Sequence, residues 1–208
     1  MRNLQIWGRM SSINVKKVVW TAQELGLSFD RHEAGGVHGV VKTPAYMALN
    51  PNSQIPTLQD GDYVLWESNV ITRYLSAKHS MGNLCPTDLR ERFDAERWME
   101  WQQTSVNPAS RNGFWHLIRL PADQRDPAMV VQSNAAVEPL MAILDAHLAT
   151  RSFMLGNRFT MADIPLGCEV HRWLGLPQGR EPRPHIERWF ASLLTRNGAK
   201  GVLDMALT

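Results

Sequence analysis

The sequence predicts an α+β amino-terminal domain with the element order β-α-β-α-β-β-α, followed by an all-helical domain. Up to about residue 80, short runs with strand periodicity alternate with runs that have helical spacing. Beyond that point only helical spacing is found, and the stretch between the two parts, SMGNLCPTD at 80–88, is rich in turn-forming residues. We therefore expect domains at 1–80 and 88–208, joined by a linker at 81–87.

The first strand and the first helix are predicted at the start of the chain. Leu4 and Ile6 alternate with polar residues, which is the period of a half-buried strand. The turn GRMSSIN at 8–14 comes next, and helical spacing then continues up to Gly26, a natural end for a helix. The apolar positions of this helix are Val15, Val18, Val19, Ala22 and Leu25.

The other elements of the first domain are marked by local signals. SFDRHE at 28–33 is a candidate second strand, and a glycine-rich loop leads from it to Thr43-Pro44, a capping residue followed by the proline favoured in a first turn. IPTLQDGDYVLWE at 55–67 predicts two strands joined at Asp60-Gly61, a hairpin signal. Helical spacing resumes in ESNVITRYLSAKH at 67–79.

Several helices of the second domain have clear starts or apolar faces. Asp126-Pro127 opens a helix with the buried stripe Val137, Leu140, Met141, Leu144 and Leu148. FTMADI at 159–164 opens another, in which Thr160 can cap the amides ahead of it while Asp163 reaches back. A further helix carries Ile186, Trp189, Phe190, Leu193 and Leu194 on one face.

Composition narrows the classes of function. The chain has 208 residues, 44% of them hydrophobic and 20% charged, with a formal net charge of +2, so a nucleic-acid partner is not favoured. We find neither an apolar run long enough to span a membrane nor a secretory signal, and we expect a cytoplasmic protein with no membrane partner. Cys85 and Cys168 lie far apart with no histidine cluster near them, which predicts packing residues and no metal site.

Three motifs in this element order resemble the cytosolic glutathione transferases. They are SINVKKV at 12–18, NPNSQIPTL at 50–58 and WESNVITRYL at 66–75, and the resemblance spans nearly the whole chain. It implies a thioredoxin-like domain that binds glutathione, followed by a helical domain that forms most of the pocket for a hydrophobic second substrate. The details are similar to bacterial serine-type enzymes of the theta, delta or nu kind.

The resemblance assigns residues to glutathione. It implies a cis Ile55-Pro56 bond, with the backbone of Ile55 pairing with the cysteinyl part of the tripeptide. Ser68 would bind the γ-glutamyl carboxylate at a helix start, where unpaired amides attract anions, and Glu67 would accept the ammonium group. The delta-type enzymes place a histidine where this chain has Ser53, so the glycine end must be bound differently, with Gln54, Lys42 and His38 as weaker candidates.

The turn at 8–14 is the expected site of thiol activation. Glutathione's thiol has a pKa of about 8.5, and a hydroxyl or amide that donates to the sulfur favours the thiolate without forming a mixed disulfide. Spacing in the serine-type enzymes selects Ser12, with Asn14 as a second donor or a helix cap. Ser11 is the close competitor, because a shift of one residue in the turn would exchange the two serines.

The resemblance implies a homodimeric enzyme that adds the glutathione thiolate to an electrophilic carbon, with glutathione as co-substrate and no metal. Asn107, Arg111 and Trp115 are the candidates for lining the second-substrate pocket. Two alternatives stay open at this point. One is glutathione-dependent reduction of disulfides or peroxides, which the pair Ser12 and Asn14 allows, and the other is a ligand carrier or partner-binding module with the same fold and no catalysis.

Overall fold

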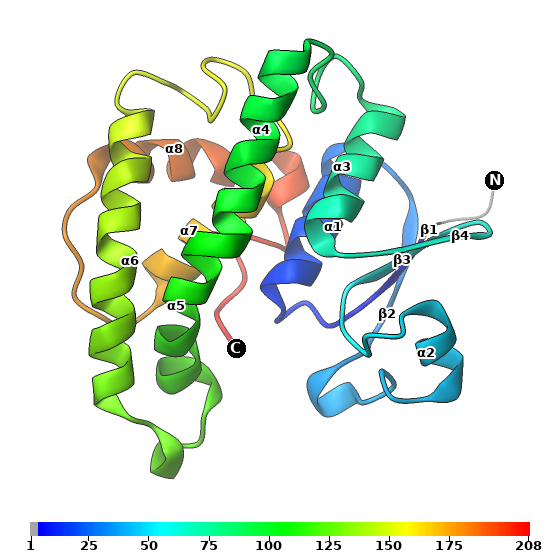
Figure 1. Cartoon of the computed structure of the whole chain (residues 1–208), viewed down its shortest axis with the longest axis horizontal. Coiled ribbons are helices and arrows are strands. Elements are labelled where there is room, and N and C mark those ends of the chain that lie inside the picture. The colour runs from blue at the N-terminus through cyan, green and yellow to red at the C-terminus, as the bar shows by residue number, and fades with distance from the viewer. Residues whose placement is uncertain (1–3) are drawn as a thin grey trace.

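A computed structural model of the protein describes residues 4–208. Four strands form a single sheet in the order β2-β1-β3-β4 (Figure 1). They are β1 (Leu4–Trp7), β2 (Phe29–His32), β3 (Thr57–Asp60) and β4 (Tyr63–Trp66). β2 runs parallel to β1, while β3 is antiparallel to both β1 and β4. The predicted order of strands and helices in this half is therefore confirmed.

Three helices belong to the sheet-containing half: α1 (Ile13–Glu24), α2 (Pro44–Leu49) and α3 (Ser68–His79). α2 begins as predicted, because the Thr43 side chain accepts a hydrogen bond from the amide of Tyr46 at 3.3 Å. The hairpin between β3 and β4 turns at residues 61–62, one residue later than the predicted Asp60-Gly61, and Gly61 supplies the positive φ that the turn needs. The Ile55-Pro56 bond is cis, as expected.

The second half consists of helices only. They are α4 (Leu89–Trp101), α5 (Asn107–Phe114), α6 (Pro127–Leu148), α7 (Asp163–Gly175) and α8 (Pro184–Leu194). The helical path is unbroken from α4 through α5, because π-helical turns at Gln102–Val106 and Trp115–Arg119 precede and follow α5. Short 3-10 turns lie at Gly36–His38, Ala122–Gln124 and Asn197–Ala199.

The predicted caps of α6 and α7 are present. The Asp126 side chain accepts from the amide of Ala128 at 2.8 Å, and α6 begins at the next residue, Pro127. Before α7, the Asp163 carboxylate accepts from the backbone amide of Thr160 at 2.9 Å, which is the reciprocal contact of a capping box. The same carboxylate also binds the indole of Trp189 at 3.0 Å, so it fixes α8 as well as the start of α7.

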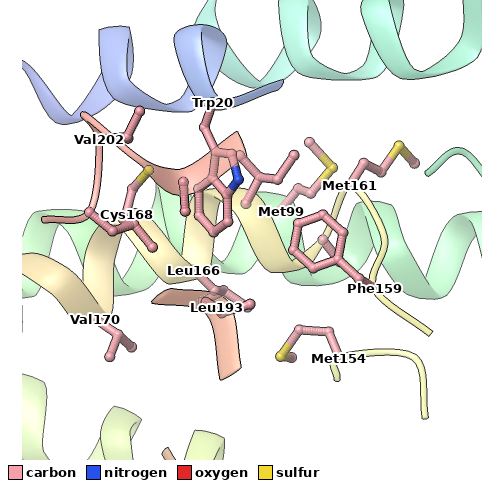
Figure 2. Close-up of a cluster of buried hydrophobic side chains, with 14 of the residues drawn as sticks. Trp20, Met99, Met154, Phe159, Met161, Leu166, Cys168, Val170, Leu193 and Val202 are labelled. Carbon is pink, nitrogen blue, oxygen red and sulfur yellow. The ribbon is translucent and has the colours of Figure 1, made fainter. Parts of the chain in front are cut away.

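A continuous hydrophobic core joins the two halves (Figure 2). The indole of Trp20 on α1 lies among side chains of the helical half, including Leu166, Cys168 and Leu193. Gly167 makes this approach possible, because a Cβ there would lie 2.8 Å from the Trp20 ring. Cys85 and Cys168 are both buried and free, in agreement with a packing role.

The change from mixed to all-helical structure falls where the sequence predicts it. α3 ends at His79 and α4 begins at Leu89, and the segment between them contains only an isolated bridge between Met81 and Cys85. The division into domains at 1–80 and 88–208 stays a prediction. Within the described residues, no helix is long and apolar enough to cross a membrane.

Candidate active site

Two cavities meet where the sheet-containing half faces the helices. The larger has a volume of about 320 Å³ and extends from the turn at 8–14 along the helical path of α5. The smaller, of about 170 Å³, lies beside the cis proline and the start of α3. Four residues line both cavities, which makes them one cleft with two ends: Asn14, Gln54, Ile55 and Gln103.

The turn between β1 and α1 brings the three predicted thiol-activating residues to the cleft. Ser11, Ser12 and Asn14 all line the larger cavity. Ser12 occupies the N-cap position of α1, yet its side chain makes no capping hydrogen bond within residues 4–208. The Ser11 hydroxyl accepts from Arg9 Nη1 at 2.7 Å and still has its proton to donate. The two serines therefore differ in that only Ser11 already has a cationic partner.

Asn14 lies at the junction of the two cavities. Its Oδ1 atom is buried and has no hydrogen-bond partner among the residues that the structure describes. Buried polar atoms of side chains are paired in the large majority of cases. An unpaired amide at the wall of a cleft is the arrangement expected of a group that binds a ligand.

The smaller cavity is built from the start of α3 and the loop before β3. Ser68 is the first residue of α3 and is buried, and its neighbour Glu67 has φ 71° and ψ 110°. A positive φ is unfavourable for glutamate, and such backbone conformations concentrate at binding sites. The unpaired amides of the α3 start face a cavity that Glu67, Ser68 and Pro56 line together.

Two buried side chains fix the loop that carries Ile55. The Tyr46 hydroxyl donates to the carbonyl oxygen of Gln54 at 2.6 Å, and Asn50 Nδ2 donates to the same oxygen at 3.0 Å. Both side chains also contact the Thr57 hydroxyl, at 2.9 and 3.1 Å. The backbone on either side of Ile55 is therefore held from below while Ile55 itself lines the cleft.

The helical wall of the larger cavity has a regular pattern. Every fourth residue lines the cavity: Gln103, Asn107, Arg111, Trp115 and Arg119. In an α-helix, with 3.6 residues per turn, each step of four residues rotates the side chain by about 40°, so such a row would leave the cleft. The two π-helical turns in this stretch have wider turns and reduce the rotation. We call these five residues the four-residue row.

A buried charged network supports the row. Lys17 on α1 is fully buried, and its Nζ donates to Gln102 at 2.7 Å and to Gln103 at 3.1 Å. Gln102 in turn donates to the Glu169 carboxylate of α7 at 2.7 Å, and that carboxylate also pairs with Arg172 at 3.4 Å. Burial lowers the pKa of Lys17 to about 8. Because Lys17 occupies Gln103 Oε1, the amide nitrogen of Gln103 is the atom left to donate.

Arginines dominate the electrostatics of the larger cavity. Arg9, Arg111, Arg119 and Arg172 line it, and none of the described lining residues is acidic. The guanidinium groups of Arg119 and Arg172 lie 5.0 and 4.8 Å from the centre of the Phe114 ring. Burial, and then the neighbouring charges of Arg9 and Arg172, lower the pKa of Arg119 to about 10.

This lining differs from the apolar pocket that the resemblance implied for the helical half. Only Ile13, Ile55, Phe114 and Trp115 supply apolar walls, and the other ten lining residues are polar or charged. The candidates Asn107, Arg111 and Trp115 do line the cavity together. The polar character arises because the four-residue row presents mostly long polar side chains while the tryptophans elsewhere, such as Trp20 and Trp173, are consumed by the core.

Other predicted residues divide between the cleft and its surroundings. Gln54, Ile55, Pro56, Glu67 and Ser68 line the smaller cavity, whereas Ser53, Lys42 and His38 line neither. The lining residues that sequence reasoning missed are Ile13, Asn50, Asn52, Trp66, Gln103, Phe114, Arg119 and Arg172. The spacing of four from Asn107 to Arg111 and Trp115 was the signal that could have found Gln103 and Arg119. Within residues 4–208, no group of three or more His, Cys, Asp or Glu side chains could hold a metal ion.

Comparison with known proteins adds to this geometry. Residues 2–77 match the family model for the glutathione S-transferase N-terminal domain, and residues 115–192 match the one for the C-terminal domain. The glutathione S-transferase GstB of Escherichia coli K12 is 34% identical over 202 residues, which cover 96% of this chain and 97% of that protein.

A solved structure of a relative has the same architecture over its full length. The theta class glutathione S-transferase from the citrus canker pathogen Xanthomonas axonopodis pv. citri, with glutathione bound, superposes with a TM-score of 0.96 at 41% identity and 100% coverage of both chains. The apo form of that enzyme gives a TM-score of 0.87. Two family models, a bacterial relative matched over nearly its whole length and this superposition agree: the chain belongs to the glutathione S-transferase family.

Proposed function

We propose that the protein binds glutathione along the cleft and activates its thiol at the turn between β1 and α1. The observation that supports this most is the junction itself. Ser11, Ser12 and Asn14 line a cavity that continues directly into the one lined by Glu67 and Ser68. A tripeptide can therefore lie with one end at α3 and its sulfur at the turn.

Ser68 and Glu67 are proposed to bind the γ-glutamyl end. The first amides of α3 and the Ser68 hydroxyl offer donors to a carboxylate, and the positive end of the helix favours its charge. Glu67 offers a carboxylate to the ammonium group. Ile55, at the edge of the sheet and held by the Gln54 anchor, offers backbone groups to the middle of the tripeptide, as a neighbouring strand would. Gln54, which lines both cavities, is the remaining candidate for the glycine end, because Ser53 lies outside them.

Ser12 is proposed as the main donor to the sulfur, with Asn14 and Ser11 beside it. A hydrogen bond to a charged acceptor stabilises by about 1.5–3 kcal/mol, and one pKa unit corresponds to about 1.4 kcal/mol. One or two such donors are enough to make thiolate the main species at neutral pH. The start of α1 contributes its dipole in the same direction.

The reaction proposed is transfer of glutathione to an electrophilic carbon. The thiol loses its proton to solvent, the sulfur forms a bond to the carbon, and the leaving group departs with its electron pair, or a conjugated double bond takes up the electrons. The chain contributes thiolate stabilisation and positioning, and the step as proposed uses no metal.

An ultraviolet difference spectrum tests the proposal. On addition of glutathione at neutral pH, we expect a thiolate absorption band that Ser12→Ala weakens. Binding without a thiolate band would favour the alternative of a ligand carrier or partner-binding module. No binding at all would refute the proposed site. Turnover with disulfides or hydroperoxides, but not with an aryl halide, would favour the reductase alternative.

We also propose that the protein is a homodimer. Large apolar side chains are exposed on neighbouring parts of the surface: Tyr63, Trp66, Val70, Leu89 and Phe93 on β4, α3 and α4 (Figure 1). α3 and α4 are in contact, because Arg73 pairs with Glu96 and Glu100. Contiguous apolar patches of this kind mark interaction surfaces.

Sedimentation equilibrium tests the dimer. Phe93 is 61% exposed, and Phe93→Asp should shift the protein toward monomer by placing a charge in the interface. Val131, 69% exposed on α6, provides the matched control, since Val131→Asp should leave the mass unchanged. A parent protein that sediments as a monomer would refute this part of the proposal. A cytoplasmic location is proposed with it, because both cysteines are free and the reduced thiol pool is cytosolic.

A further inference from the structure

The larger cavity has more positive charge than the chain itself neutralises. Of its four arginines, Arg172 pairs with Glu169, whereas Arg9, Arg111 and Arg119 form no ion pair with any described residue. Unpaired charges at the wall of a partly enclosed cavity are unfavourable unless water or a ligand of opposite charge meets them. The cavity is therefore complementary to an anion.

Individual hydrogen bonds indicate which guanidinium groups are available. Arg119 is held in place by the carbonyl oxygens of Ser11, at 2.6 Å, and Thr208, at 2.7 Å, through Nη2 and Nε. Its Nη1 atom is left for a ligand. Arg9 uses Nη1 for the Ser11 hydroxyl, and its buried Nε has no partner within residues 4–208. No hydrogen bond or ion pair ties the Arg111 side chain to another described residue.

Arg111 and Arg119 lie away from the part of the cleft proposed for glutathione. In the four-residue row, Gln103 lines both cavities, whereas Asn107, Arg111, Trp115 and Arg119 line only the larger one. The γ-glutamyl carboxylate is assigned to the start of α3, in the smaller cavity. The two arginines are thus placed to meet a charge that the second substrate brings. The depressed pKa of Arg119, caused by burial and by Arg9 and Arg172, has the same meaning, since an anion beside it would relieve that repulsion.

We infer that the second substrate of this protein carries a carboxylate, which Arg111 and Arg119 bind while Trp115 and Phe114 contact its carbon skeleton. The inference rests on the proposed transferase function and names the class of its acceptor. Two donors on each guanidinium suit the two oxygens of a carboxylate. The cavity volume of about 320 Å³ is that of a site for one small molecule.

A matched pair of aryl halides tests the inference: 4-chloro-3-nitrobenzoate and 4-chloro-3-nitrobenzamide. In both, the glutathione sulfur forms a bond to the ring carbon that carries chlorine, and chloride leaves with the bonding electrons. They differ in charge at the far side of the ring. Each kcat/KM is divided by the rate constant of the uncatalysed reaction with glutathione, which removes the difference in intrinsic reactivity. We expect the parent to favour the benzoate by about 10- to 100-fold, the range for one charge-assisted hydrogen-bonding contact.

Arg111→Gln is the decisive variant, because Arg111 supports no other described side chain. It should lower the normalised kcat/KM for the benzoate by about 10-fold or more and leave that for the benzamide within about 2-fold. Arg111→Lys should retain part of the preference, since the charge stays and the fork is lost. Arg90→Gln, which removes an exposed arginine of α4 outside the cavity, is the control for net charge and should leave both substrates unchanged.

Binding of the two reaction products provides a readout that does not depend on turnover. S-(4-carboxy-2-nitrophenyl)glutathione should bind about 10-fold or more tightly than its 4-carbamoyl counterpart in calorimetry, and Arg111→Gln should abolish the difference. Equal normalised turnover of both halides, equal affinity for both conjugates, or a preference that Arg111→Gln leaves intact would overturn the inference while the transferase function stands. Tighter binding of the carboxylate conjugate without catalysed conjugation would refute the proposed function and support the anion site.

Discussion

The two walls of the cleft are built by different means. The wall from the sheet-containing half uses backbone groups and short side chains, such as Ser12, Asn14 and Ser68, at the starts of helices. The wall from the helical half uses long side chains in a row along a nearly continuous helix. The first arrangement suits a ligand of fixed shape. The second can change its charge and length at single positions without disturbing the backbone.

The supports behind the two walls differ as well. Neutral hydrogen bonds from Tyr46 and Asn50 hold the Gln54 carbonyl and with it the loop of Ile55. The helical wall depends on buried charges, because Lys17, Glu169 and Arg172 meet behind Gln102 and Gln103. A buried charge that loses its partner is far more costly than a lost neutral hydrogen bond. The helical wall should therefore be the more sensitive of the two to substitution from behind.

The largest effect is expected at Glu169. Glu169→Leu leaves Arg172 and Lys17 without their buried carboxylate and should lower the free energy of unfolding by about 3–5 kcal/mol. Urea denaturation at neutral pH measures it. Glu181→Leu, at an exposed acid with no described partner, is the control and should change stability by less than about 0.5 kcal/mol. Similar losses in the two variants would contradict the importance given to the network.

The proposed thiol donor comes next. Ser12→Ala should lower kcat with an aryl halide by about 10- to 100-fold, because one hydrogen bond to the thiolate is lost, and should change glutathione affinity much less. Ser11→Ala is the matched comparison on the same turn. If Ser11→Ala has the larger effect, the hydroxyl that Arg9 contacts is the main donor, and if neither variant slows turnover the turn has no part in activation.

A smaller effect is expected at the other end of the tripeptide. Ser68→Ala removes one donor to the γ-glutamyl carboxylate and should weaken glutathione binding by about 10-fold, with little change in kcat. Equilibrium titration with glutathione measures it. Val70→Ala, on the same helix and partly exposed outside the cleft, controls for a general effect on α3. Unchanged affinity in Ser68→Ala would contradict the assigned carboxylate site.

The smallest effect concerns pH and Lys17. Burial lowers its pKa in the folded protein to about 8 from an ordinary value of 10.5, so between these values the unfolded chain binds more protons than the folded one. Stability of the parent relative to Lys17→Met should therefore rise with pH in this window, by up to about 1.4 kcal/mol per pH unit. Chemical denaturation of both proteins at several pH values measures it. A difference that is flat or falls with pH would show that Lys17 keeps its proton when folded.

The wall from the sheet-containing half was largely predictable because its signals are local. Thr43-Pro44, Asp60-Gly61 and Gly26 each mark a boundary within a few residues, and the observed elements begin or end there or one residue away. Glu67 and Ser68 could be placed at a helix start for the same reason. Ser53 was misplaced because its distance from the cleft depends on the path of a loop.

The helical wall was less predictable because its features depend on distant contacts. Lys17 follows Lys16 in a stretch that reads as solvated, yet its partners Gln102 and Gln103 are 85 and 86 residues away. A repeat of four residues also differs from the 3.6-residue period used to find helix faces. Arg119 could be related to Arg111 only once the π-helical turns were known.

The π-helical turn at Gln102–Val106 has a consequence for insertions and deletions. Loss of one residue there would convert the turn to regular α-helix and rotate everything after it by about 100°. Arg111 would then leave the cleft although no side chain of the protein had been exchanged. In this segment the length of the chain, as much as the identity of its residues, determines which substrates the cleft accepts.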